Sequence, residues 1–254
     1  MGVLRSELNA YFSDILKPEL FKDYAPNGLQ VEGKNTIKKI ISAVTASRYV
    51  IEQCIHFNAD ALLVHHGLFW PGESAVITGL KKQRIAQLLN HDINLFAYHL
   101  PLDAHKEFGN NIQLAHLFDI DVIGTLDHSA NKLGLVFYGQ LSTAISSQQF
   151  AAKIQSQLNR APLVINGNNK IIEKLAWCTG AAQDALQYAI DAGLDAFITG
   201  EVSERTYHLA QEADICFIAA GHHATERYGV QALGKHLTQV FDIKHQFIDE
   251  PNPV

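Results

Sequence analysis

The chain has 254 residues, of which 47% are hydrophobic, and it carries a formal net charge of −6 at pH 7. This length and apolar content suit one large domain or two smaller ones, and an acidic balance without a prominent basic run argues against nucleic acid as a partner. The sequence has no stretch of about 18 apolar residues that would span a bilayer, and its start lacks the basic and apolar regions of a signal peptide. We therefore expect a cytoplasmic protein with no membrane partner.

The first half of the chain alternates predicted helices and strands. An amphipathic helix begins the chain and is followed by a loop marked by Pro and Gly at 23–35. Strands are then predicted at 40–46, 61–67 and 94–105, the last stopped by Pro101, and helices at 47–58, 81–92 and 110–120. The polar, turn-rich segment 124–134 predicts a domain boundary.

The same alternation restarts after this boundary. Strands are predicted at 133–141, 172–180, 196–200, 216–221 and 245–250, and helices at 146–159, 183–193, 203–213 and 225–239. Repeated strand–helix–strand units predict an α/β fold with two α/β domains and mixed, largely parallel sheets. We expect a metal-binding domain at 1–126 plus 217–254 and a second domain at 127–216. Periodicity by itself leaves open whether the last helix and strand rejoin the first domain.

Three predicted strands end in histidine and acidic residues. The segment VHHG contains His65 and His66, HLPLDAH contains His99, Asp103 and His105, and GHHATE contains His222, His223 and Glu226. Ligand sites of parallel α/β sheets gather at the carboxyl ends of strands, so these side chains are expected at the same edge of a sheet. Imidazole and carboxylate are the usual ligands of divalent transition metals. The sequence therefore predicts a metal site.

Each motif by itself has a simpler explanation. A histidine pair can be a polar strand end, the spacing of His222 and Glu226 occurs on many surface helices, and Asp103 can cap a turn. The spacing of four residues places His222 and Glu226 on one helix face, with His223 about 100° to the side. The three cysteines, Cys54, Cys178 and Cys216, are widely spaced and are expected to pack as small apolar groups.

Several blocks of sequence resemble the NIF-three-like family, whose members are often labelled GTP cyclohydrolase I type 2 homologues. These blocks are LLVHHG, AYHLPLDAH with the following GNN, ITGEV and AAGHHATERYGVQAL, and the matches run from Asn27 to the final PNP. The resemblance implies two α/β domains, a dinuclear metal centre and a ring-shaped homohexamer built from dimers. It also selects His222 over His223, and implies a ligand set of His65, His66, Asp103, His222 and Glu226.

Three further residues are candidates for orienting the ligands. His99 and His105 can act as partners of the ligands or as hydrogen-bonded residues at a strand end. Glu201, which follows another predicted strand, can face the site or can interact with the start of the next helix.

The leading functional hypothesis is a metal-dependent hydrolase. Two divalent ions per chain would lower the pKa of a bridging water for attack on carbon or phosphorus of a small phosphate-bearing or heterocyclic substrate. The family label implies opening of the GTP ring. The alternatives are a non-enzymatic metal-binding or scaffold protein in a ring-shaped assembly, or a plain α/β domain with incidental histidines. The ligand types leave zinc, iron, manganese, cobalt and nickel open.

Overall fold

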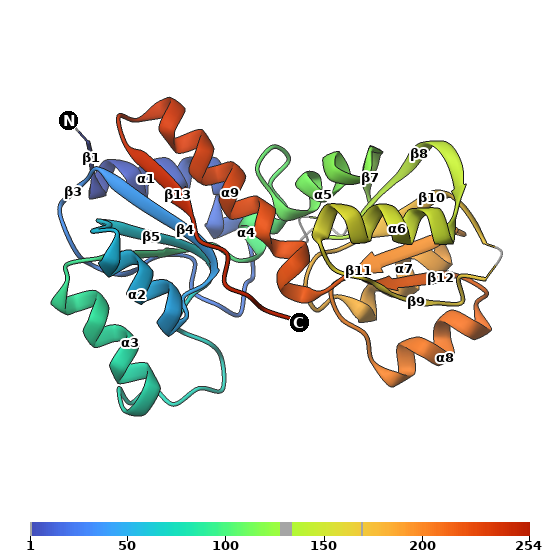
Figure 1. Cartoon of the computed structure of the whole chain (residues 1–254), viewed down its shortest axis with the longest axis horizontal. Helices are drawn as coiled ribbons and strands as arrows, with labels where there is room; N and C mark the ends of the chain where they lie inside the picture. Colours follow the sequence, from blue (N-terminus) through green and yellow to red (C-terminus); the bar gives the residue numbers. More distant parts are fainter. Residues whose placement is uncertain (1, 128–133, 169) are drawn as a thin grey trace. The chain divides into compact units, whose positions relative to one another are not determined.

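The computed structural model describes residues 2–127, 134–168 and 170–254 (Figure 1). The chain divides into two compact units. The first unit comprises Met1–Gly109 with Gly229–Pro251, and the second comprises Asn110–Tyr228 with Asn252–Val254. Strands and helices alternate along the chain in both units, which confirms the predicted α/β class.

The first unit contains a five-stranded sheet in the order β13-β4-β5-β6-β2. These strands are β13 (Lys244–Phe247), β4 (Lys39–Thr45), β5 (Ala61–His66), β6 (Asn94–Ala97) and β2 (Gly28–Val31). The pairs from β13 to β6 are parallel, and β2 is antiparallel to β6. The short strands β1 (Val3–Leu4) and β3 (Thr36–Ile37) pair separately. The largely parallel sheet that the sequence predicts is therefore found in this unit.

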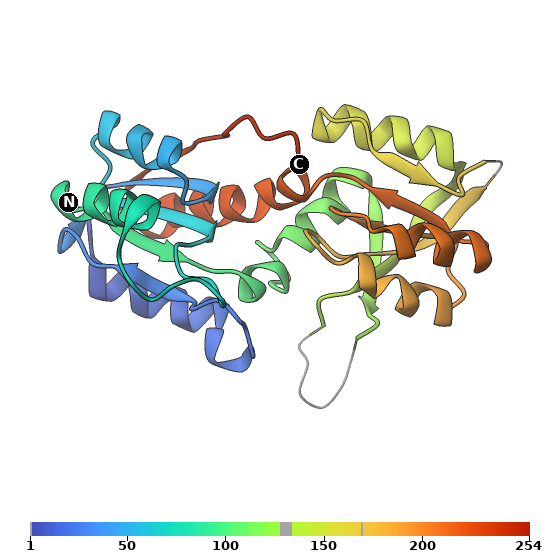
Figure 2. The same ribbon diagram turned by 90° about the horizontal axis from the view of Figure 1, so that it is seen from below.

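Helices cover both faces of this sheet. On one face, α2 (Arg48–His56) and α3 (Gly79–Asn90) pack on Ile41, Leu62 and Val64. On the other, α1 (Arg5–Leu16) and the later part of α9 (His222–Val240) pack on Ile40 and Leu63. Neighbouring strand residues point to opposite faces, which explains why both faces are apolar. Figure 2 shows α1 and α2 on opposite sides of the sheet.

The second unit contains a six-stranded sheet in the order β7-β8-β10-β11-β12-β9. The strands are β7 (Ile120–Thr125), β8 (Phe137–Ser146), β10 (Ile171–Trp177), β11 (Ala196–Thr199), β12 (Cys216–Ala219) and β9 (Leu163–Ile165). The pairs β10–β11 and β11–β12 are parallel, and the pairs β7–β8, β8–β10 and β12–β9 are antiparallel. This sheet is therefore mixed and not largely parallel.

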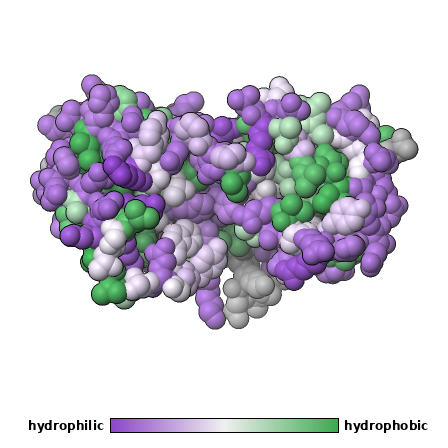
Figure 3. Space-filling view, turned by 60° about the horizontal axis from the view of Figure 1, so that its bottom comes forward, coloured by the Kyte–Doolittle hydropathy of each residue, from purple (hydrophilic) through white to green (hydrophobic). Residues whose placement is uncertain are grey.

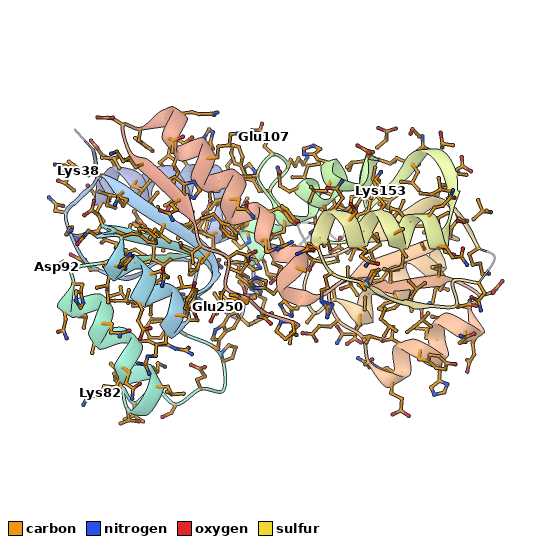
Figure 4. All side chains as sticks on the ribbon, in the orientation of Figure 1. Lys38, Lys82, Asp92, Glu107, Lys153 and Glu250 are labelled. Atoms are coloured by element: carbon orange, nitrogen blue, oxygen red, sulfur yellow. The ribbon has the colours of Figure 1, made fainter. Side chains whose placement is uncertain are left out.

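The helices of the second unit also cover two faces. On one side, α5 (Asn110–Phe118) and α6 (Ser147–Leu158) contribute Leu114, Phe118, Phe150 and Ile154 to an apolar cluster. On the other, α7 (Leu186–Asp191) and α8 (Glu204–Glu212) pack in a second cluster. Lys153 of α6, labelled in Figure 4, donates to Phe118 O at 2.6 Å and so joins α6 to the end of α5. Short 3₁₀ turns lie at Pro18–Leu20 and Gln183–Ala185.

The unit boundaries differ from the expected domain limits at two places. Residues 110–126, expected in the first domain, lie in the second unit, because β7 pairs with β8 and α5 packs in the core of that unit. β12 and the start of α9 also lie in the second unit, because β12 is paired on both sides within the six-stranded sheet. Residues 128–133 of the expected boundary segment lie outside the described residues.

Three local predictions were wrong. The segment 23–35 was expected to be a loop throughout, but it contains β2, which forms because β6 offers it a hydrogen-bonding edge. The strand predicted at 94–105 ends at Ala97 and is followed by the short helix α4 (Leu100–Asp103), in which Pro101 occupies the first turn. The helix predicted from residue 225 begins at His222.

Within the described ranges, none of the helices is both long and apolar enough to cross a bilayer. The three cysteines are buried and unbridged. Burial raises the pKa of the Cys54 thiol to about 12 and that of Cys216 to about 11, so neither thiol is ionised near neutral pH.

Candidate metal centre

The carboxyl ends of β5 and β6 bring three imidazoles together in the first unit. His65, His66 and His99 each offer a nitrogen that lies within 4.8 Å of those of the other two. The two strands are parallel neighbours, with Val64 opposite Ala97, so the residues that follow them emerge at the same edge of the sheet. The structure thus brings two of the three predicted strand ends together within the first unit, at this imidazole trio.

His65 is held in one orientation. Its Nδ1 lies 3.0 Å from Tyr98 O, and because a carbonyl only accepts hydrogen bonds, Nδ1 carries the proton. The lone pair is then on Nε2, which lies 3.5 Å from Asp103 Oδ2. A carbonyl that fixes one nitrogen while the other faces a carboxylate is the arrangement that orients metal-binding histidines.

Asp103 reaches this position through α4. The chain turns into this helix after His99, and Asp103 N donates to His99 O at 3.2 Å. The residue is only 6% exposed, and His65 is fully buried. A buried carboxylate is unfavourable without a nearby positive charge or hydrogen-bond donors. Asp103 lies beside His65 Nε2, and an imidazole with a carboxylate can serve as a pair of ligands for a cation.

The other two imidazoles of the trio also have partners at Nδ1. His66 Nδ1 lies 3.2 Å from Thr45 Oγ1. His99 Nδ1 donates to Asp23 Oδ1 at 3.0 Å. Asn27 contacts both residues, because its Nδ2 donates to Asp23 Oδ2 and its Oδ1 accepts a hydrogen bond from His99 N. Burial raises the pKa of Asp23, but hydrogen bonds from His99 and Asn27 outweigh this, so its pKa lies well below the usual range.

Asp23 is a site residue that the sequence analysis missed. It lies in the segment DYAPNG, at the start of the predicted loop 23–35, and it is far from His99 along the chain. The polar residues of that loop were the only available signal. The two roles considered for His99, orienting a ligand and hydrogen bonding at a strand end, stay predictions, and the contact with Asp23 fits both.

The first turn of α9 carries the predicted ligands of the second unit. His222 Nε2 lies 3.1 Å from Glu226 Oε2, and His222 Nδ1 lies 2.6 Å from Glu201 Oε1. The helix begins at His222, so the four-residue spacing places both side chains on one face. Glu201, which follows β11, thus contacts the histidine that the resemblance selects.

The electrostatics of His222 reflect these carboxylates. Burial lowers its pKa, but hydrogen bonds and charge attraction from Glu226 and then Glu201 raise the pKa to about 9. Glu226 is only 2% exposed. A protonated His222 would balance the charge of the buried carboxylate, and a metal bound at Nε2 would take the place of the proton there.

Gly180 and Thr225 frame this turn and were not singled out from the sequence. Gly180 has φ +69°, and a Cβ there would overlap Glu226 Oε1 and lie 3.3 Å from His222 Nε2. Its N–H donates to Thr225 Oγ1 at 3.1 Å, and Thr225 Oγ1 donates to His222 O at 2.9 Å. The glycine permits a close approach of the end of β10 to the two candidate ligands.

The donor set in each unit fits a divalent transition metal. Both units contain a buried carboxylate beside an Nε2 atom, and in both the Nδ1 atom of that imidazole is already bonded to an oxygen acceptor. Imidazole with carboxylate suits zinc, iron, manganese and related ions. The described residues thus include groups that could hold a metal.

Comparison with known proteins agrees with the sequence motifs. Residues 3–253 match the family model described as Duf34/NIF3 (NGG1p interacting factor 3). The chain belongs to the Duf34/NIF3 family. This confirms the resemblance drawn from the sequence blocks, and it extends over nearly the whole chain.

Several relatives have a related name or fold. A protein of Pseudomonas aeruginosa named GTP cyclohydrolase 1 type 2 homolog is 50% identical over 253 residues, covering 100% of both chains. A protein of Escherichia coli K12 with the same name is 47% identical, covering 98% of both. The solved structure titled protein ybgI, unknown function, has a TM-score of 0.94 and 46% identity, covering 99% of this chain and 100% of that one.

His105 has other contacts in this member of the family. Its Nδ1 accepts hydrogen bonds from Glu107 N at 3.2 Å and Phe108 N at 3.0 Å, and its ring stacks on Phe108. Burial lowers its pKa. These contacts show His105 capping the turn after α4, and its predicted role in orienting ligands stays a prediction.

The second unit also has an open pocket of about 610 Å³ near β9 and α8, lined by Leu163, Val202 and Tyr207 among others. Its lining residues do not include the candidate ligands. Figure 3 shows a mostly hydrophilic surface with a compact apolar patch (green) on the second unit. Because the candidate ligands lie outside this pocket, the chemistry that the chain can perform follows from the imidazoles and carboxylates and not from the pocket.

Proposed function

We propose that this chain is a metal-dependent hydrolase and that His65, His66, Asp103, His222 and Glu226 hold two divalent ions. One observation carries the proposal. His65 and His222, in different units, each have Nδ1 bonded to an oxygen acceptor and Nε2 next to a buried carboxylate. An ordinary buried histidine needs a partner for its polar atoms, but it does not need a buried acid on the second nitrogen.

Each residue has a defined part in this proposal. Bound divalent ions would supply an activated water near neutral pH and would stabilise negative charge that develops on the substrate. Asp103 and Glu226 would contribute negative charge that retains the ions. Tyr98 O and Glu201 would orient the imidazoles of His65 and His222 for binding through Nε2. Asp23 and Asn27 hold His99 beside His66.

The proposed substrate is a small phosphate-bearing or heterocyclic compound. The named relatives are homologues of GTP cyclohydrolase 1 type 2, and opening of the guanine ring of GTP is a hydrolysis at an electrophilic ring carbon. We carry this name over to the present chain as a proposal. We also propose that the protein assembles as a ring-shaped homohexamer and acts in the cytoplasm, as the family resemblance implies.

Storage or delivery of metal is the second candidate function. It is favoured by the complete burial of His65 and the 2% exposure of Glu226, because a closed ligand shell holds an ion without admitting substrate. The side chain of His222 is 25% exposed, which favours access from solvent and so the hydrolase.

The deciding experiment is elemental analysis of tag-free protein with matched histidine variants. We expect about two equivalents of transition metal per chain in the parent. We expect loss of metal in His65→Ala and His222→Ala, and parent-like content in His91→Ala and His208→Ala, which change histidines outside the candidate centre. Absence of metal from the parent, even after incubation with zinc or manganese, would overturn the proposal.

Hydrolysis assays then separate the two functions. A hydrolase should open GTP or cleave a phosphoester in the metal-loaded form, lose this activity with a chelator and recover it when metal is restored. A protein that binds two ions tightly, but turns over neither purine nucleotides nor phosphoesters, would favour storage.

A further inference from the structure

Two aromatic side chains lie beside the imidazole trio in the first unit. The ring of Trp70 is 5.5 Å from the rings of both His66 and His99, measured between centroids. The ring of Tyr24 is 5.0 Å from that of His99 and 6.0 Å from that of Trp70. Both residues come from loops, one before β2 and one after β5. The proposed hydrolytic function leaves them without a role.

The two loops are tied together by Gln30. Its side-chain amide donates to Pro26 O at 2.8 Å and accepts from Leu68 N at 2.9 Å, so it joins the loop of Tyr24 to the loop of Trp70. A Cβ at Gly67 would overlap the amide of Gln30, so a side chain there would displace this amide. The indole of Trp70 is oriented by its Nε1, which donates to Gly67 O at 3.1 Å.

The backbone around Tyr24 is also anchored. Asp23 accepts hydrogen bonds from Ala25 N at 3.1 Å and from Leu100 N at 3.0 Å, in addition to its bond with His99. Despite this anchoring, the residue Tyr24 is 61% exposed, and Trp70 is half-buried. Two aromatic rings are thus held in fixed loops with surface left accessible to solvent.

An isolated exposed tyrosine needs no explanation. The arrangement here differs, because Tyr24 neighbours a tryptophan and both adjoin candidate metal-binding groups. Preorganised loops reduce the conformational entropy that a ligand must overcome. Aromatic side chains with open surface bind planar rings by stacking, and nearly every nucleobase presents such a face.

We propose that Tyr24 and Trp70 form a stacking surface for the planar aromatic ring of a heterocyclic substrate. This inference rests on the proposed hydrolase function and narrows it, since a phosphoester without an aromatic ring would have no use for the surface. His66 and His99, which contact Trp70, place the stacked ring next to the imidazole trio. Tyr24 and Trp70 are thus substrate-binding residues that determine specificity for the ring.

The test uses metal-free full-length protein and two probes that differ by the ring. GMP carries a purine on a phosphorylated ribose, and ribose 5-phosphate carries the same sugar phosphate without it. The chain has two tryptophans, and Trp177 is only 1% exposed, so a change of emission on ligand contact reports on Trp70. We expect GMP to quench this emission and ribose 5-phosphate to leave it unchanged.

Variants are then compared by calorimetric titration of GMP. We expect Tyr24→Ala and Trp70→Ala each to weaken binding about tenfold, since stacking contributes on this scale. Tyr24→Phe and Trp70→Phe keep a ring and should bind GMP within about threefold of the parent. Tyr49→Ala, which changes a 42% exposed tyrosine of α2, is the control for loss of an exposed ring. Thermal unfolding of each variant confirms that it is folded.

The inference is overturned if GMP and ribose 5-phosphate bind alike, if neither binds the folded parent, or if the alanine variants bind GMP as the parent does. These outcomes are independent of metal content. If the parent binds no metal but still binds GMP and not ribose 5-phosphate, the hydrolase proposal fails and the stacking surface stands. If the parent binds metal but does not distinguish GMP from ribose 5-phosphate, the stacking surface fails and the hydrolase proposal stands.

Discussion

At the residue scale, the position of His222 depends on Glu201. The carboxylate of Glu201 lies 2.6 Å from His222 Nδ1, and its contact leaves Nε2 to face Glu226. The sequence placed Glu201 at a strand end and left its role open between the site and the helix start. The structure shows Glu201 in contact with the candidate ligand, and the next helix, α8, begins three residues further on, at Glu204.

Replacing Glu201 by Gln tests this orienting role. The amide can still accept a hydrogen bond from Nδ1, but it lacks the charge that makes the imidazole a better ligand. We expect about 10- to 100-fold weaker metal affinity with little change in folding. Competition with a chromogenic chelator measures the affinity. Glu204→Gln, on the same segment, should behave like the parent, and equal affinities for all three proteins would contradict the role.

Gly180 offers a second test, with a matched glycine as control. Gly180→Ala adds a Cβ to a residue with φ +69°, and this atom would overlap Glu226 Oε1. Gly193→Ala adds a Cβ to a residue with φ +64°, where no other atom lies within 4 Å. Both variants should lose roughly 1 kcal/mol of folding free energy from backbone strain. Only Gly180→Ala should also lose bound metal. Urea denaturation and elemental analysis measure the two effects, and parent-like metal content in Gly180→Ala would show that Glu226 has room to move.

At the element scale, β13 and α9 meet at a half-buried histidine in the first unit. His245 of β13 lies with its Nε2 at 2.8 Å from Ser42 Oγ on β4, and a Cβ on Gly234 of α9 would overlap its ring. Burial lowers the pKa of His245 to about 4. A small residue on the helix therefore lets the histidine pack in its neutral form.

This packing predicts a loss of stability on acidification. The unfolded chain takes up a proton near pH 6.5 and the folded chain only near pH 4, so the neutral form favours folding above pH 6.5. The free energy of unfolding should fall between these values, by about 3 kcal/mol at most. Urea denaturation of chelator-treated protein at pH 7.5 and pH 5 measures the slope. His245→Gln should flatten it, and an unchanged slope would assign the effect to other groups.

The edge strands explain the main errors of the sequence-based prediction. β2, β7 and β9 each lie at an edge of a sheet and were missed because such a strand is stabilised by the neighbour that it pairs with and not by its own periodicity. Each pairs antiparallel with a neighbouring strand. The central strands and long helices were predicted because their apolar residues recur at regular spacing, as Leu8, Phe12 and Leu16 do in α1.

At the scale of the whole molecule, bound metal should stabilise the fold. A ligand that binds the folded chain and not the unfolded one raises the unfolding free energy by RT ln(1 + [L]/Kd). Thermal unfolding should thus occur several degrees lower after treatment with a chelator, and zinc or manganese should restore it. Asp103→Asn should show a much smaller difference between the two states than His91→Ala. Equal shifts in both variants would place the stabilising ion elsewhere.

The sequence by itself determined the fold class, the family, most of the long elements and the candidate ligands. Parallel strands place the residues that follow them at one sheet edge, so motifs such as VHHG and HLPLDAH are informative from local order. The tertiary structure decided what depends on contacts between distant segments. These are the bond of Asp23 to His99, the approach of Gly180 to Glu226 and the pairing of Tyr24 with Trp70. No local pattern encodes them, because each arises when two turns far apart in the chain pack against each other.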